Sequence, residues 1–83
     1  MPGEKIDKQA LNELINKMSQ FEENVIRELR NLDQKTEELS YVWKDPQYKE
    51  FEGYMTDLIY DLIKELQYII AEKEELKYIY DHL

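Results

Sequence analysis

The chain has 83 residues, no cysteine and a net charge of −8, so we expect one small domain without disulfides or thiolate sites. Acidic residues are spread over both halves, and this charge repels phosphate, which argues against nucleic acid and anionic membranes as partners. The longest uncharged stretch, "LQYIIA" at 66–71, is too short to span a membrane. No basic start followed by an apolar run is present, so we expect a cytoplasmic protein, with export by a non-Sec route as the alternative.

The first predicted helix covers about 7–43. Asp7 is a favourable N-cap, because its side chain can accept hydrogen bonds from the free N–H groups of the first turn. Ile6 and Leu11 have the spacing of a hydrophobic staple around this cap. Apolar residues then recur at steps of three and four, which is helical spacing, with one extra step of four at Val25. The members of this stripe are Leu11, Leu14, Met18, Phe21, Val25, Leu29, Leu32, Thr36, Leu39 and Trp43.

A turn at 44–45 separates this helix from a second one, predicted to cover about 46–83. Asp45 can cap the second helix, and Pro46 then falls at the first helical position, where its missing N–H costs nothing. Lys73 is the one charged member of the apolar stripe, and we expect its stem to lie on the stripe while its ammonium group reaches water. The stripe consists of Tyr48, Phe51, Met55, Leu58, Leu62, Leu66, Ile69, Lys73, Leu76, Tyr80 and Leu83.

The two stripes predict an all-α protein in which the helices form an antiparallel hairpin. The second stripe also has an extra step of four, centred on Leu62, and it matches the one at Val25 only if the chain folds back on itself. The second helix carries a further apolar line, which predicts a dimer interface and a four-helix bundle. A homodimer is the simplest arrangement, and a heterodimer is the alternative. The predicted interface residues are Tyr54, Ile59, Ile63, Leu66 and Ile70.

The residues needed for catalysis are absent from rigid positions, so we expect a protein that is not an enzyme and has no cofactor or metal. Cysteine is missing, and the single histidine, His82, lies near the C-terminal end. Ile79 occupies the position three residues before it, so the Glu-x-x-His motif of di-iron bundles is missing. Neighbouring acids such as Glu22 and Glu23 diverge on a helix, and we interpret them as solvated.

Aromatic residues gather at the predicted turn, in the stretch "YVWKDPQYKEF" at 41–51. Trp43 and Phe51 belong to the two inward stripes, so we expect their rings to pack together at the tip of the hairpin. Tyr41 and Tyr48 flank the turn, where each ring either covers the tip or meets a partner protein. We therefore keep both tyrosines as candidate recognition residues.

This arrangement resembles the WXG family, the small helical-hairpin proteins associated with type VII (ESX) secretion and its Gram-negative relatives. Trp43 matches the family tryptophan at the bend, and Phe51 matches the aromatic residue eight positions later. The "KID" start before the first helix is also similar. Asp45 stands where the family has glycine, so the motif here reads W-x-D.

The resemblance implies a non-enzymatic protein that serves as an adaptor, a chaperone or a substrate in a secretion or effector system, with another protein as its partner. Two further functions fit the residue pattern. The chain could be a structural coiled-coil subunit that scaffolds a larger complex, or a small antitoxin or inhibitor whose acidic surface suits a basic target.

Overall fold

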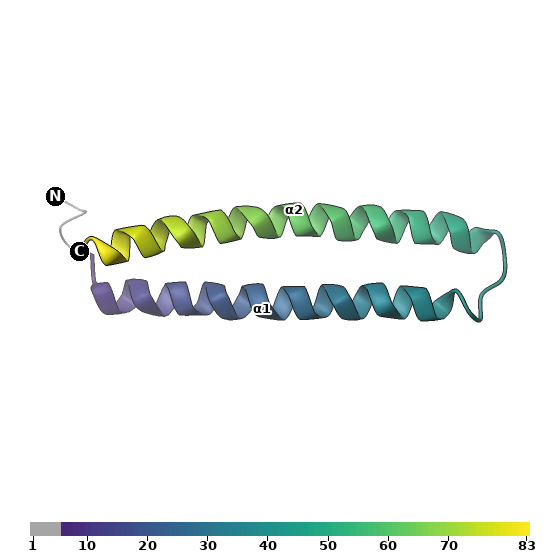
Figure 1. Ribbon diagram of the computed structural model, residues 1–83, viewed down its shortest axis with the longest axis horizontal. Coiled ribbons are helices and arrows are strands. Elements are labelled where there is room, and N and C mark those ends of the chain that lie inside the picture. Colours follow the sequence, from purple (N-terminus) through teal and green to yellow (C-terminus); the bar gives the residue numbers. More distant parts are fainter. Residues whose placement is uncertain (1–5) are drawn as a thin grey trace.

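The computed structural model describes residues 6–83, which form two long helices, α1 (Lys8–Leu39) and α2 (Gln47–Asp81). The helices lie side by side and antiparallel, so the start of α1 is close to the end of α2 (Figure 1). The hairpin measures 62 × 17 × 14 Å. The predicted all-α antiparallel hairpin is thus confirmed for this part of the chain. The first five residues, including the lysine of the "KID" stretch, lie outside the described residues.

The start of α1 has the capping arrangement that the sequence predicts. The Asp7 side chain accepts hydrogen bonds from the backbone N–H groups of Gln9, at 2.9 Å, and Ala10, at 3.3 Å. These two groups have no partner inside the helix, so the carboxylate satisfies donors that would otherwise depend on water.

The end of α1 differs from the prediction, because the helix stops at Leu39 and the turn covers 40–46. In a continuing α-helix the Ser40 N–H would bond to the Thr36 carbonyl, but it bonds to the Glu37 carbonyl instead, at 3.0 Å. The next two N–H groups also reach back three residues, which tightens the chain into a 3₁₀-like turn. Tyr48 Oη from α2 donates to the Thr36 carbonyl at 2.9 Å, so a tertiary contact completes the last turn.

The line of contact between the two helices also differs from the predicted stripes. On α1 the buried residue is Ile15, which is 7% exposed, whereas Leu14 and Phe21 are 50% and 49% exposed. On α2, Ile59 is half-buried and Leu58 is 48% exposed. Each exposed residue therefore lies beside the contact line rather than on it, and the extra steps of four do not exist.

We call the observed contact line the seam. Its positions alternate in steps of four and three along the whole chain, as in an uninterrupted heptad repeat. Glu22 and Glu52 occupy two of these positions. The predicted apolar stripes use their neighbours Phe21 and Phe51 instead, and this choice produces the apparent extra steps of four. All seam residues are buried or half-buried except Leu32, Leu62 and Leu83. The seam consists of Leu11, Ile15, Met18, Glu22, Val25, Leu29, Leu32, Thr36, Leu39 and Trp43, facing Tyr48, Glu52, Met55, Ile59, Leu62, Leu66, Ile69, Lys73, Leu76, Tyr80 and Leu83.

The expectation that the Lys73 ammonium group reaches water is wrong. Lys73 is buried, at 9% exposed, and its Nζ forms an ion pair and hydrogen bond with the Glu22 carboxylate from α1. Glu22 is therefore not a solvated residue of the helix surface as expected. The two charges occupy seam positions on opposite helices, so each supplies the partner that a buried charge requires.

The core of the hairpin is thin. Only Ile15, Tyr48 and Leu66 are buried hydrophobic residues, and none of the side chains in residues 6–83 is wholly enclosed. The accessible surface is 6827 Å², whereas a compact monomer of this mass exposes about 5,300 Å². Two helices alone leave apolar flanks uncovered, and these flanks are the main candidates for function.

Candidate functional site

Three aromatic rings form a cluster at the tip of the hairpin. The Trp43 and Phe51 rings lie 5.6 Å apart between centroids, which is the contact that the sequence predicts. The Tyr48 ring lies edge-on to Trp43 at 5.7 Å and is 6.4 Å from Phe51. Because edge-to-face and tilted pairs at these distances are favourable, the cluster fixes the turn against the first part of α2.

Tyr48 is a core residue rather than a surface recognition residue. It is 5% exposed, the lowest value among the buried hydrophobic residues, and its hydroxyl is bonded to the Thr36 carbonyl. Tyr41 is 65% exposed and remains available to a partner. The signal for this difference was in the heptad spacing, which places Tyr48 on the seam and Tyr41 outside it.

The turn closes without a left-handed residue. No non-glycine residue in 6–83 has a positive φ, so the position where the WXG family has glycine does not require glycine here. The Asp45 carboxylate accepts the Gln47 N–H at 2.8 Å. Pro46 has helical dihedrals, with φ −54° and ψ −25°, and directly precedes α2. The helix thus begins at Gln47, one residue later than predicted, with Pro46 rather than Asp45 at the N-cap position, while the Asp45 carboxylate holds the first N–H of α2.

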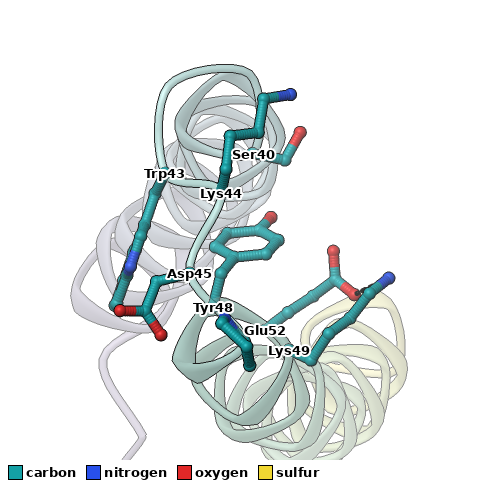
Figure 2. Close-up of a pocket in the computed structure, with 8 residues that line it drawn as sticks. Ser40, Trp43, Lys44, Asp45, Tyr48, Lys49 and Glu52 are labelled. Carbon is teal, nitrogen blue, oxygen red and sulfur yellow. Dashed lines mark ion pairs between the residues drawn. The ribbon is translucent and has the colours of Figure 1, made fainter.

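A hollow of about 390 Å³ lies beside the turn (Figure 2). Three of its four charged groups are already engaged, because Asp45 accepts the Gln47 N–H and Lys49 lies 3.9 Å from the Glu52 carboxylate. The hydroxyl of Ser40 donates to the Glu37 carbonyl. The hollow therefore presents two cations and two carboxylates but no nucleophile held against a base. It is lined by Ser40, Trp43, Lys44, Asp45, Pro46, Tyr48, Lys49 and Glu52.

The tip also changes the acidity of one phenol. Burial raises the pKa of Tyr48 above its usual value of 10.0, and the nearby Glu52 carboxylate raises it further because it disfavours a second negative charge. The phenol therefore stays protonated, and its hydroxyl remains a donor, at every pH below about 10.

One apolar groove, which we call the Ile63 flank, runs along one side of the seam. It joins Ile26 of α1 with Ile63 and Ile70 of α2, and its volume is about 320 Å³. Ile63 is 41% exposed, although it is a large aliphatic side chain near the middle of α2. Arg30 and Gln67 form the polar rim of this groove.

The Ile63 flank contains only part of the predicted dimer interface. Ile63, Leu66 and Ile70 all line the groove, and Leu66, which is 6% exposed, lies at its base in the seam. Ile59 is also a half-buried seam residue. Tyr54 lies one turn before Leu58, on the other side of the seam, and is 67% exposed. The five predicted residues therefore do not form one surface.

A second apolar surface, which we call the Phe21 flank, lies on that other side. Its exposed members are Leu14, Phe21, Leu32, Leu58 and Leu62, with exposed fractions between 36% and 50%. Phe21, Leu32 and Leu62 line a groove of about 340 Å³ together with Val25 and Leu29 of the seam. Hydrophobic spacing does not predict this flank, because it places Leu14, Phe21 and Leu58 in the contact between the helices.

Two features are absent from the described residues, a group of side chains that could hold a metal ion and a helix that could span a membrane. In residues 6–83, no three histidine, cysteine or acidic side chains come close enough together to hold a metal ion. Neither described helix combines the length and the apolar character needed to cross a membrane. Comparison of this chain with known proteins finds no matching family model, no matching curated protein and no matching solved structure.

Proposed function

We propose that this protein is a non-enzymatic protein-binding hairpin that pairs with a second copy of itself through the Ile63 flank and forms a four-helix bundle. The observation that carries the proposal is the groove between Ile26, Ile63 and Ile70, which the two helices of one chain leave open. Ile63 is 41% exposed at this groove, and covering the groove would remove its apolar surface from water.

The position and charge of the Ile63 flank favour a second copy over an unrelated protein. Ile26 and Ile63 lie near the middle of their helices, so two hairpins related by a two-fold axis at this point would overlap along most of their length. The charges beside the groove have mixed sign, with Arg30 on its rim and a Lys77–Glu74 ion pair of 3.7 Å one turn beyond Ile70. Mixed charges reduce the repulsion that a net charge of −8 would otherwise cause.

We also propose that the hairpin is a WXG-like adaptor, chaperone or substrate of a secretion or effector system. The support is the tip, where Trp43 lies at the bend and its ring packs on Phe51 eight residues later. A helical hairpin with a tryptophan at the bend and an aromatic residue eight positions later is what the resemblance implies. The test is to compare culture medium from the organism that encodes the chain, with and without the ATPase of its secretion system. Loss of the protein from the medium would support export, whereas its absence from the medium of both strains would exclude it.

Light scattering on flank variants tests the pairing. We expect the native chain to have about twice the chain mass of 10.2 kDa. Ile63→Asp should give the monomer mass, because it buries an unpaired charge in the interface. Phe21→Asp is the matched control, since Phe21 is 49% exposed and Ile63 is 41% exposed. It should leave the dimer intact, and the proposed interface is wrong if Phe21→Asp dissociates the protein while Ile63→Asp does not.

A further inference from the structure

We propose that the Phe21 flank is a docking surface for an amphipathic helix of another protein, with lysine or arginine residues on both sides of that helix's apolar stripe. The flank lies on the side of the seam opposite the Ile63 flank, so a dimer formed through the Ile63 flank leaves it free. The inference goes beyond the proposed function, because it concerns a different surface and a different partner.

The apolar part of the flank has the length and shape of a helix-binding groove. Leu14 and Phe21 lie beside the seam on α1, Leu58 lies beside it on α2, and the exposed seam residues Leu32 and Leu62 adjoin them. Leu14 and Leu32 are 18 residues apart, which is about 27 Å along a helix. Phe21 is the large side chain near the middle of this line, and a helix with apolar residues at steps of three and four would present its stripe to it.

The rim of the Phe21 flank is acidic. Glu28 follows Phe21 by seven residues and lines the groove, and Glu65 and Glu72 follow Leu58 at the same interval on α2. All three glutamates are exposed, and no lysine or arginine in residues 6–83 forms an ion pair with them. Lys35 lies on the same edge of α1 but is paired with Glu38 at 3.2 Å.

This charge pattern selects the occupant. A second copy of the chain would bring its own acidic rim against Glu28 and Glu65, and like charges placed together are costly. An anionic membrane surface is repelled for the same reason. A basic amphipathic helix complements both the apolar residues and the acidic rim of the flank. Its apolar stripe would cover Phe21 and Leu58, and its cations would face the glutamates.

The test uses two synthetic helical peptides of about 18 residues, the length that spans the groove. Both have a leucine stripe at steps of three and four, and the positions beside the stripe are lysine in one peptide and glutamate in the other. Binding is measured by calorimetry at physiological salt. We expect the lysine peptide to bind in the micromolar range and the glutamate peptide to bind at least roughly a hundredfold more weakly. No binding of the lysine peptide, or equal binding of both peptides, would overturn the proposal.

Variants locate the binding surface. Phe21→Ser and Leu58→Ser should each weaken the lysine peptide by roughly tenfold, because each removes a large apolar contact. The double variant Glu28→Gln with Glu65→Gln should weaken binding of the lysine peptide by a few fold and make that binding less dependent on salt concentration. Ile63→Ser is the matched control, and we expect it to bind the lysine peptide with the affinity of the native chain. Circular dichroism checks that each variant is helical, and light scattering of Leu58→Ser checks the dimer separately. Full affinity of Leu58→Ser, or a loss confined to Ile63→Ser, would contradict the assignment.

Discussion

The ion pair between Glu22 and Lys73 gives the sharpest test of the seam, because Glu22 occupies a seam position that the predicted apolar stripe skips. The Lys73 side chain is 11% exposed and the Glu22 side chain is 21% exposed. Replacing Glu22 with leucine would remove the only partner seen for the buried ammonium group in the described residues. Removing one partner of a buried pair typically costs about 3–5 kcal/mol.

That cost is large for a hairpin with so thin a core. A change of 1 kcal/mol shifts the Tm of a domain of this size by about 4–8 °C, so Glu22→Leu should lower the Tm by more than about 12 °C. The assay is thermal unfolding followed by circular dichroism at fixed protein concentration, because association also stabilises the folded state.

The double variant Glu22→Leu with Lys73→Leu separates lost packing from the unpaired charge. It turns both positions into ordinary apolar seam positions, and replacing a buried pair by apolar residues is often neutral or stabilising. We therefore expect its Tm to equal or exceed that of the native chain. If Glu22→Leu melts within about 2 °C of the native protein, Glu22 and Lys73 do not face each other across the seam.

The tip makes three further predictions. Tyr48→Phe should lower the Tm by about 4–8 °C, because the Thr36 carbonyl loses its donor. Tyr41→Phe should leave the Tm unchanged, because Tyr41 is exposed. Tyr48→Ala should lower the Tm more than Trp43→Ala, since Tyr48 is buried and Trp43 is only half-buried; the reverse order would show that Trp43 anchors the tip. The raised pKa of Tyr48 means that the folded state keeps its proton longer than the unfolded state, so its contribution to stability is complete below pH 10.0 and is lost as the pH rises through the folded pKa. Alkaline unfolding of the native protein and Tyr48→Phe, followed by circular dichroism, should show a smaller loss in the variant.

Much of the fold could be predicted from the sequence because its signals are local. The Asp7 cap, the Asp45–Pro46 start of α2 and the contact between Trp43 and Phe51 each depend on a few neighbouring residues. Helical spacing without glycine or proline in the helix interiors, apart from Gly53, leaves one place for the turn. The position of that turn and the antiparallel pairing follow from these features.

The seam could not be predicted correctly because hydrophobic spacing alone does not separate a contact line from the positions beside it. Leu14 and Ile15 are both apolar neighbours, and so are Leu58 and Ile59. The structure selects Ile15 and Ile59 because the resulting frame repeats every seven residues. That choice requires a glutamate at 22, which is acceptable only because Lys73 lies opposite it. A charged pair across two helices is a tertiary contact, and one helix by itself carries no sign of it.

The end of α1 was missed for a similar reason. The stripe continues in helical spacing to Trp43, so the local pattern favours a helix over the whole of 7–43. The turn begins earlier, and the Tyr48 hydroxyl from α2 donates to the Thr36 carbonyl that the Ser40 N–H would use in a continuing α-helix. The acceptor is thus used by a residue twelve positions away.

Methyl resonances followed during dilution test most directly the central claim that the two flanks have different partners. The native chain is labelled at isoleucine and leucine methyl groups and diluted through the concentration at which the dimer dissociates. We predict that the Ile26, Ile63 and Ile70 signals shift together while those of Leu14 and Leu58 stay in place, because only the Ile63 flank is covered in the dimer. Shifts confined to Leu14 and Leu58, or no shift in any methyl group down to the lowest concentration, would contradict the account.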